Sequence, residues 1–198
     1  VYPDGKKRSY FVRRNNAPLN EEDIKAIEDT DKEFDLLRAH TRASNKTIIG
    51  GENPNPKDQT IDANIVTELR RYLSNANKEY KTLAGLSRHG VDPNKPLFLN
   101  LGFHFPHTPV LPPKSVRERF KNKTYNLPKF NEKQLGKLPP QLQQYYQTLK
   151  MYGLNDEEMQ QAIQDYYAFA AHGDELVGEA VTAFKEYSEQ NNQPWVII

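Results

Sequence analysis

Two histidines stand three positions apart where an apolar run ends, in the stretch "LFLNLGFHFPHTPVLPP" at residues 97–113. His104 follows the run directly, and Pro106 and Pro109 restrict the turn that carries both His104 and His107. A protonated imidazole binds an anion, and it also gives a proton to a leaving oxygen. The spacing therefore predicts either an acid or anion site, or two histidines that only fill the end of a strand.

Other kinds of site find less support. The chain has no cysteine, which excludes disulfides, thiolate zinc sites and a cysteine nucleophile within these residues. It has no G-x-S-x-G elbow, and "IIGGENP" matches no phosphate-binding loop. The Pro-containing turn gives the two histidines no helical metal-ligand geometry, and no third ligand is close in sequence, so we predict no metal ligand here.

The elements around the histidines predict an α/β fold. Residues 97–103 are almost continuously apolar, as in a strand that is covered on both faces of a parallel sheet. A helix from Ile61, capped by Asp58 or Thr60, precedes this run, and a long helix followed by the apolar residues 194–198 comes after it. Strand, helix and second strand make a parallel crossover. We expect a mostly parallel sheet flanked by helices, with ligands bound beyond the carboxyl ends of its strands.

Helical periodicity predicts which helix faces are packed. On the first helix the apolar residues of one face are Ile61, Ile65, Leu69, Tyr72 and Leu73. On the long helix they are Met159, Ile163, Tyr166, Tyr167, Ala170, Val177, Val181 and Phe184. Asp174 lies on this second face, where a carboxylate needs a partner, and the neighbouring Gly173 and Gly178 allow another backbone to approach.

The rest of the chain predicts further helices and one basic loop. Asn20 is a cap for a helix that carries Ile24, Ile27, Phe34 and Leu37, residues 141–153 are helical in pattern, and Asn155 or Asp156 begins the last helix. Residues 121–155 are expected to be a surface excursion. The lysines at its start are either a solvated surface or a rim that attracts an anionic substrate; they are Lys121, Lys123, Lys129, Lys133 and Lys137.

Composition bounds the class of protein. The 27 Lys and Arg residues balance 26 Asp and Glu residues, and a net charge of +1 argues against a nucleic-acid partner. No apolar run approaches the roughly 20 residues that span a bilayer. The chain begins at Val1 and ends in the apolar "PWVII", so we expect both ends to be cut from a longer protein.

Three segments resemble the type I sulfatases of the alkaline-phosphatase-like superfamily. "PLFLNLGFHFPHTPVLPPKSV" is similar to the family segment in which a buried strand ends in F-H-x-P-H-x-P, before a proline-rich turn and a Lys. "QDYYAFAAHGDELVGEAVTAF" resembles the helix that leads into the strand before the family's D-H-G metal motif, and "DQTIDANIVTELRRYL" resembles the helix before the first strand. The resemblance covers residues 58–120 and 160–198, and the paired histidines are most similar to iduronate-type sulfatases.

The resemblance implies a fold and an activity. Residues 1–198 would be the central part of a sulfatase catalytic domain, truncated at both ends, within an alkaline-phosphatase-like sandwich. The family hydrolyses sulfate esters, often of carbohydrates, with a formylglycine made from Cys or Ser and a calcium ion held by acidic residues. Both are expected outside this sequence, which has no C/S-x-P-S-R motif. Because sulfatases that act on polysaccharides are usually exported, the resemblance suggests a periplasmic or extracellular location.

The resemblance also implies roles for individual residues. His104 matches the histidine that contacts the sulfate and helps to protonate the leaving alcohol, so it is the expected catalytic residue. His107 matches a variable position and is the expected substrate-binding residue. Asp174 matches a structural position on the helix, and Lys114 and Arg117, just past the motif, are weaker candidates for substrate contact.

Two other functions stay open at this point. A phosphodiesterase or phosphonate monoester hydrolase of the same superfamily shares the fold and sometimes the His-x-Pro-His turn. A non-catalytic glycan-binding remnant would keep the fold without the chemistry.

We expect the 198 residues alone to have no sulfatase activity, because the nucleophile and the calcium ligands would lie outside them. The measurement is incubation of the purified chain with an aryl sulfate such as p-nitrophenyl sulfate. Clear turnover would contradict this expectation.

Overall fold

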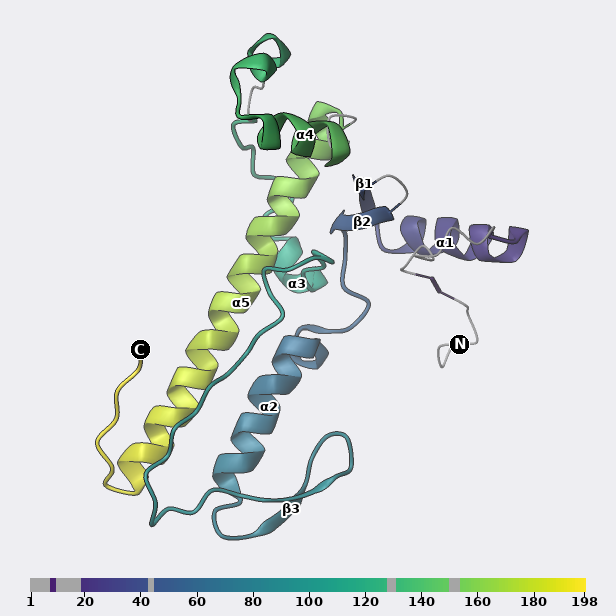
Figure 1. Cartoon of the computed structure of the whole chain (residues 1–198). Helices are drawn as coiled ribbons and strands as arrows, with labels where there is room; N and C mark the ends of the chain where they lie inside the picture. The colour runs from purple at the N-terminus through teal and green to yellow at the C-terminus, as the bar shows by residue number, and fades with distance from the viewer. Residues whose placement is uncertain (1–7, 10–18, 43–44, 128–130, 150–153) are drawn as a thin grey trace. The chain divides into compact units, whose positions relative to one another are not determined.

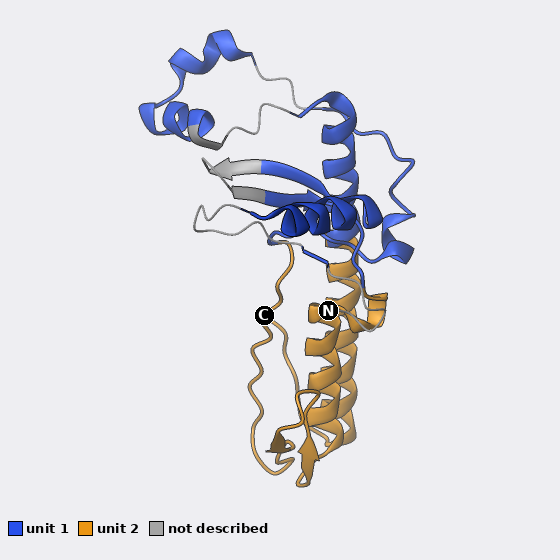
Figure 2. Cartoon of the chain, turned by 90° about the vertical axis from the view of Figure 1, so that its right-hand side faces the viewer, with its two compact units in different colours: residues 1–54, 107–169 blue, residues 55–106, 170–198 orange. Residues whose placement is uncertain are grey.

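The protein is a mixed α/β chain, seen in a computed structural model that describes residues 8–9, 19–42, 45–127, 131–149 and 154–198 (Figure 1). Its residues divide into two compact units (Figure 2). Unit 1 comprises residues 1–54 and 107–169, and unit 2 comprises residues 55–106 and 170–198. Each unit has its own buried apolar residues.

Unit 2 is built on helix α2 (Ile61–Ser74) and the second part of helix α5 (Asp156–Gln190), which lie side by side (Figures 1 and 2). Thr60 caps helix α2, and its hydroxyl accepts the N–H of Ala63, so the second of the two predicted caps, Asp58 or Thr60, is the one that forms. The two helices share one apolar core, made of Ala63, Val66, Leu69, Leu73, Val91, Leu176, Ala180 and Tyr187. Of the predicted α2 face, Leu69, Leu73 and Tyr72 pack in or against this core, whereas Ile61 is exposed. Ala63 and Val66, which the sequence did not assign to that face, are buried.

A short 3-10 turn, η1 (Lys57–Gln59), precedes α2, and a small antiparallel hairpin follows it. The hairpin pairs β3 (Glu79–Lys81) with β4 (Ser87–His89) and places Tyr80 opposite Arg88.

Residues 97–103 are not the buried sheet strand that the sequence predicted. Every second residue of the segment packs against the α2–α5 core; these are Leu97, Leu99, Leu101 and Phe103. The residues between them are exposed, and Phe98 is 87% exposed. This period of two is that of a strand, but only one face is covered. In the described part of the chain the segment makes no β-ladder.

Residues 194–198 likewise form no ladder within the described residues, and their side chains are exposed, so this segment is not the sheet strand that the sequence predicted. The sheets that the described residues do form are two antiparallel hairpins. A parallel sheet is therefore not among the described elements. A ladder needs a neighbouring strand, and the packing helices cover only one side of residues 97–103.

Unit 1 begins with helix α1 (Glu21–Glu33), capped as predicted by Asn20, whose side chain accepts the N–H of Asp23. The helix ends earlier than its apolar pattern predicted. Asp35 adopts a φ of 51°, outside the helical region, and Leu37 already belongs to a strand. That strand, β1 (Leu37–Arg42), pairs antiparallel with β2 (Asn45–Gly50).

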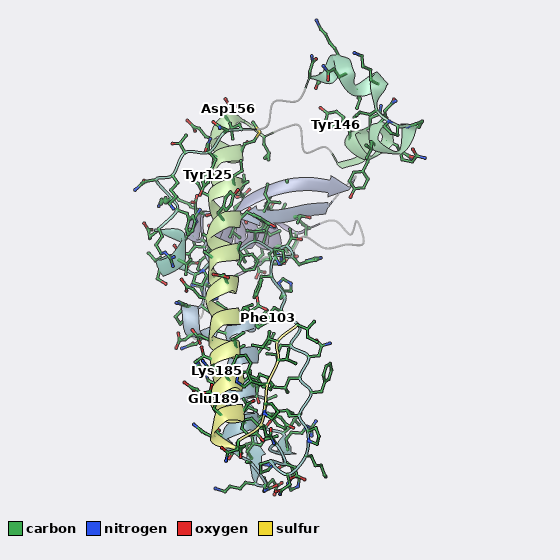
Figure 3. All side chains as sticks on the ribbon, turned by 90° about the vertical axis from the view of Figure 1, so that its left-hand side faces the viewer. Phe103, Tyr125, Tyr146, Asp156, Lys185 and Glu189 are labelled. Carbon is green, nitrogen blue, oxygen red and sulfur yellow. The ribbon has the colours of Figure 1, made fainter. Side chains whose placement is uncertain are left out.

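The remaining elements of unit 1 are α3 (Lys114–Arg117), the 3-10 helix η2 (Glu132–Lys137), α4 (Pro140–Leu149) and the first part of α5. The predicted helix at 141–153 is thus confirmed in α4 as far as Leu149, and residues 150–153 lie outside the described residues. Asn155 caps α5 in a reciprocal pair with Glu158, in which each backbone N–H donates to the other's side chain at 2.9 Å. Tyr125 stacks on Tyr167 of α5 with ring centroids 4.8 Å apart (Figure 3).

The buried face of α5 differs from the predicted face. Tyr166, Tyr167 and Val177 are exposed, and the buried residues are Asp165, Ala168, Phe169, His172, Gly173, Leu176, Ala180, Tyr187 and Ser188. Asp174 is exposed, so the prediction that its carboxylate lies on the packed face is wrong. The helix carries apolar residues on two faces, and its polar residues Asp165 and His172 are buried through specific partners, which periodicity alone does not detect.

One buried ion pair links several segments of unit 1. Arg117, 5% exposed, donates from Nε to Asp165 Oδ1 at 2.6 Å and from Nη2 to Asp165 Oδ2 at 3.0 Å. Nη2 also lies 2.7 Å from Asp35 Oδ2. Gly51 donates its N–H to Asp165 Oδ2 at 2.8 Å, and a Cβ on Gly50 would lie 2.8 Å from the same oxygen. The Gly-Gly pair thus lets the end of β2 approach the carboxylate.

The positive charge of Arg117 is stabilised by its two carboxylate partners, Asp165 and Asp35. Burial by itself would lower the pKa of Arg117, but its bonds to Asp165 and Asp35 outweigh burial and raise that pKa above its usual value. Arg117 is therefore charged, and its side chain is bound to Asp165 and Asp35. The prediction that Arg117 is a candidate for substrate contact is wrong.

Removal of Arg117 should destabilise the protein strongly, because it leaves the Asp165 carboxylate buried without its cation. We expect Arg117→Met to lower the free energy of unfolding by about 3–5 kcal/mol, measured by urea denaturation. The matched control is Lys121→Met, which removes an exposed cation 3.9 Å from Glu118 and should cost about 0–1 kcal/mol. Equal losses in the two variants would contradict the role of the buried pair.

Candidate functional site

His104 lies at the end of the segment that packs on the unit 2 core, and its side chain is exposed. Its backbone N–H donates to Asp62 Oδ1 at 2.5 Å. Asp62 is in the first turn of α2 and is 4% exposed. A carboxylate is favoured there by the positive end of the helix dipole. The ring of His104 therefore projects from a backbone position that a buried charge holds.

The residues on either side of His104 are aromatic and packed. Phe103 and Phe105 stack with ring centroids 4.9 Å apart, and Phe103 also contacts the α2–α5 core (Figure 3). The Phe105 ring lies against Gly173 of α5, where a Cβ would come within 2.5 Å of two ring carbons. The close approach predicted at Gly173 is thus made by a side chain. At Gly178, the second predicted position, no atom lies within 4 Å of such a Cβ.

Another histidine of unit 2, which the sequence did not single out, is buried on α5. His172 of α5 is 1% exposed, and its Nε2 lies 3.1 Å from Oγ1 of Thr60, the α2 cap. Its Nδ1 has no hydrogen-bond partner among the described residues. Nearby, Lys57 Nζ lies 2.5 Å from Glu175 Oε2. The start of α2 is therefore joined to α5 through one hydrogen bond and one ion pair.

Burial lowers the pKa of His172, and the positive charge of Lys57 acts in the same direction. The carboxylates of Glu175, Asp62 and Glu179 oppose this effect and raise the pKa, but they do not overcome it. The neutral imidazole is accordingly the form that the folded chain favours.

His107 is also exposed, and it belongs to unit 1. Its Nδ1 lies 2.6 Å from the carbonyl oxygen of Thr108, which only accepts, so Nδ1 carries the proton. The proline-rich turn that follows is anchored to the residues after β2. Asn53 bonds the carbonyls of Leu111 and Pro112, and Pro112 and Pro113 are buried.

The predicted lysines lie at the surface. Lys114, the other weaker candidate for substrate contact, is exposed, and its Nζ lies 4.0 Å from Glu52 Oε1. The lysines of the basic loop that fall in the described residues are exposed as well; they are Lys121, Lys123, Lys133 and Lys137. Lys129 lies outside the described residues. Lys123 sits over the Phe120 ring at 4.6 Å.

In the described ranges no group of three or more His, Asp or Glu side chains is arranged to hold a metal ion. No helix there is both long and apolar enough to cross a bilayer.

Comparison with protein-family models, with curated proteins and with solved structures finds no match to this chain.

Asp62, Thr60 and His172 are the residues of this site that periodicity and motif analysis missed or assigned only a capping role. The signal for Asp62 was an acidic residue in the first turn after a helix cap, a common pattern that by itself indicates only helix-dipole stabilisation. Nothing local to residue 62 indicates a bond to residue 104.

The stability of the chain should fall as the pH drops below the ordinary His pKa of about 6.5. Because the folded-state pKa of His172 is lowered, the unfolded chain binds more protons in this range, and stability is lost as the pH falls toward the folded-state value. His172→Gln should remove this slope in urea unfolding measured between neutral and mildly acidic pH. His89→Gln, at an exposed histidine of the same unit, should retain it. An unchanged slope in His172→Gln would show that another group is responsible.

Proposed function

We propose that residues 1–198 are the central part of a type I sulfatase catalytic domain, and that His104 protonates the leaving alcohol during sulfate-ester hydrolysis. The observation that carries this proposal is the placement of His104. The F-H-x-P-H-x-P motif keeps the His104 backbone bound to buried Asp62 while its imidazole is exposed. A general acid needs this combination of a fixed position and access to substrate.

The arrangement of unit 2 supports the alkaline-phosphatase-like fold that the proposal requires. Residues 97–103 and 194–198 leave the same end of the unit, where Gln193 Nε2 donates to the carbonyl of Pro93 at 2.8 Å. From there both segments run in the same direction and are joined through α5 (Figures 1 and 2). Parallel strands joined by a helix have this geometry.

The backbone of these two segments is consistent with a sheet position as well. Residues 97–103 have one packed face and one exposed face with strand periodicity, and neither segment has ladder partners within the described residues. Unpaired strand edges of this kind invite pairing with further strands. Under the proposal, other parts of the sulfatase domain would supply those strands.

The chemistry assigned to this chain is limited to proton transfer and substrate contact. As the S–O bond to the alcohol breaks, the protonated His104 imidazole gives its proton to the departing oxygen and becomes neutral. His107 contacts the substrate. Formylglycine and calcium, when present, supply the attack at sulfur and the neutralisation of its charge. The described residues offer no calcium cluster, so no step is assigned to this chain through the ion.

Replacement of His104 should reduce sulfate-ester hydrolysis by the protein expressed from its whole reading frame. We expect His104→Ala to lower kcat by about 10²–10⁴-fold on a sugar sulfate, whose alkoxide leaves poorly. The loss should be smaller on p-nitrophenyl sulfate, because an acidic phenol needs less help from a general acid. Turnover is measured as sulfate release, and His89→Ala serves as the exposed control.

Three outcomes would contradict the proposal. An equal loss on the two substrates would remove the acid role from His104, and full activity in His104→Ala would remove it from the site altogether. Hydrolysis of phosphodiesters or phosphonate monoesters in preference to sulfate esters would assign the protein to the alternative branch of the superfamily.

A further inference from the structure

We propose that Asp62 is a positioning residue for His104, whose carboxylate fixes the backbone from which the imidazole projects. The role in catalysis rests on the function proposed above. The contact itself belongs to this chain and is independent of that function.

The bond between the two residues is of a strong kind. The His104 N–H donates to Asp62 Oδ1 at 2.5 Å, and the acceptor is an acidic side chain that is almost fully buried. Hydrogen bonds to ionised acceptors are shorter and stronger than neutral ones. A buried carboxylate without partners is costly, so the same bond also satisfies Asp62. Breaking this bond therefore costs free energy at both groups.

The carboxylate is itself held in place. Asp62 occupies the first turn of α2, two residues after the Thr60 cap, and Thr60 contacts His172 of α5 at 3.1 Å. The ion pair between Lys57 and Glu175 ties the residues before α2 to the same stretch of α5. All of these residues belong to unit 2. Asp62 therefore transmits the position of the α2–α5 pair to residue 104.

Packing restrains the chain on both sides of the bond. Phe103 contacts the α2–α5 core before His104, and the Phe105 ring fills the space that Gly173 leaves after it. These contacts fix the backbone from which the side chain of His104 extends. A displacement of about 1 Å in a catalytic group can cost on the order of 10²-fold in rate, so a device that fixes this backbone affects the reaction directly.

The test uses amide hydrogen exchange and NMR on the full 198-residue chain, with three variants. Asp62→Ala removes the acceptor, Asp62→Asn keeps an acceptor oxygen without the charge, and Thr60→Ala removes the helix cap but keeps the carboxylate. We expect Asp62→Ala to speed exchange of the His104 amide by about 10–100-fold, with Asp62→Asn intermediate. Thr60→Ala should speed exchange of the Leu69 amide within α2 more than that of His104.

The outcomes separate positioning from general stability. If Thr60→Ala accelerates the His104 amide as much as Asp62→Ala does, or if Asp62→Ala leaves it unchanged, the proposal is overturned. Should Asp62→Ala not fold, Asp62→Asn decides. An upfield move of the His104 amide proton larger than that of amides distant from residue 62 supports the bond, and an unmoved resonance refutes it.

A kinetic arm on the protein from the whole reading frame links the contact to the reaction. Asp62→Ala should lower kcat on a sugar sulfate with little change in KM, and Asp62→Asn should restore part of the rate. If Asp62→Ala does not speed exchange of the His104 amide although the wild-type protein is an active sulfatase, the positioning role alone is refuted. If Asp62→Ala speeds that exchange but the wild-type protein has no sulfatase activity, the contact is established and the proposed function is refuted.

Discussion

The hydrogen bond from the His104 N–H to the Asp62 carboxylate is the contact on which the candidate site depends. It joins the end of an extended segment to the start of a helix more than forty positions earlier in the sequence. The helix start is in turn joined to α5 through Thr60 and His172. The exposed imidazole of His104 is thereby attached to the α2–α5 pair of unit 2. The proton transfer that we propose needs such a fixed backbone.

Buried polar groups also hold the segments of unit 1 together. The Arg117–Asp165 pair ties α3, α5 and the end of β2 together, and Asn53 bonds the carbonyls of the proline-rich turn after His107. Polar groups in such places are costly unless they are paired, and pairing restricts them to one arrangement. In both units the histidine-bearing segment is thus anchored by polar contacts to residues distant in the sequence.

Local features could be predicted from the sequence, and features that depend on distant partners could not. The caps at Asn20, Thr60 and Asn155 are correct because a side chain and a backbone N–H a few residues away decide them. The positions of Arg117 and Asp174 were predicted wrongly because their surroundings come from other segments. The strand at residues 97–103 shows the limit most clearly. The alternation of its packed and exposed side chains could be seen in the sequence, but a sheet also needs a second strand to pair with, and the alternation does not show whether one is present.

The proposed site requires that the imidazole of His104 faces the sulfur-bearing group of the substrate. The most direct measurement is a crystal structure of the protein from the whole reading frame with bound inorganic sulfate. We expect a sulfate oxygen about 2.7–3.2 Å from a ring nitrogen of His104, with the Asp62 bond to its backbone intact. A sulfate bound elsewhere, with the His104 ring buried among apolar side chains or turned away from the anion, would contradict it.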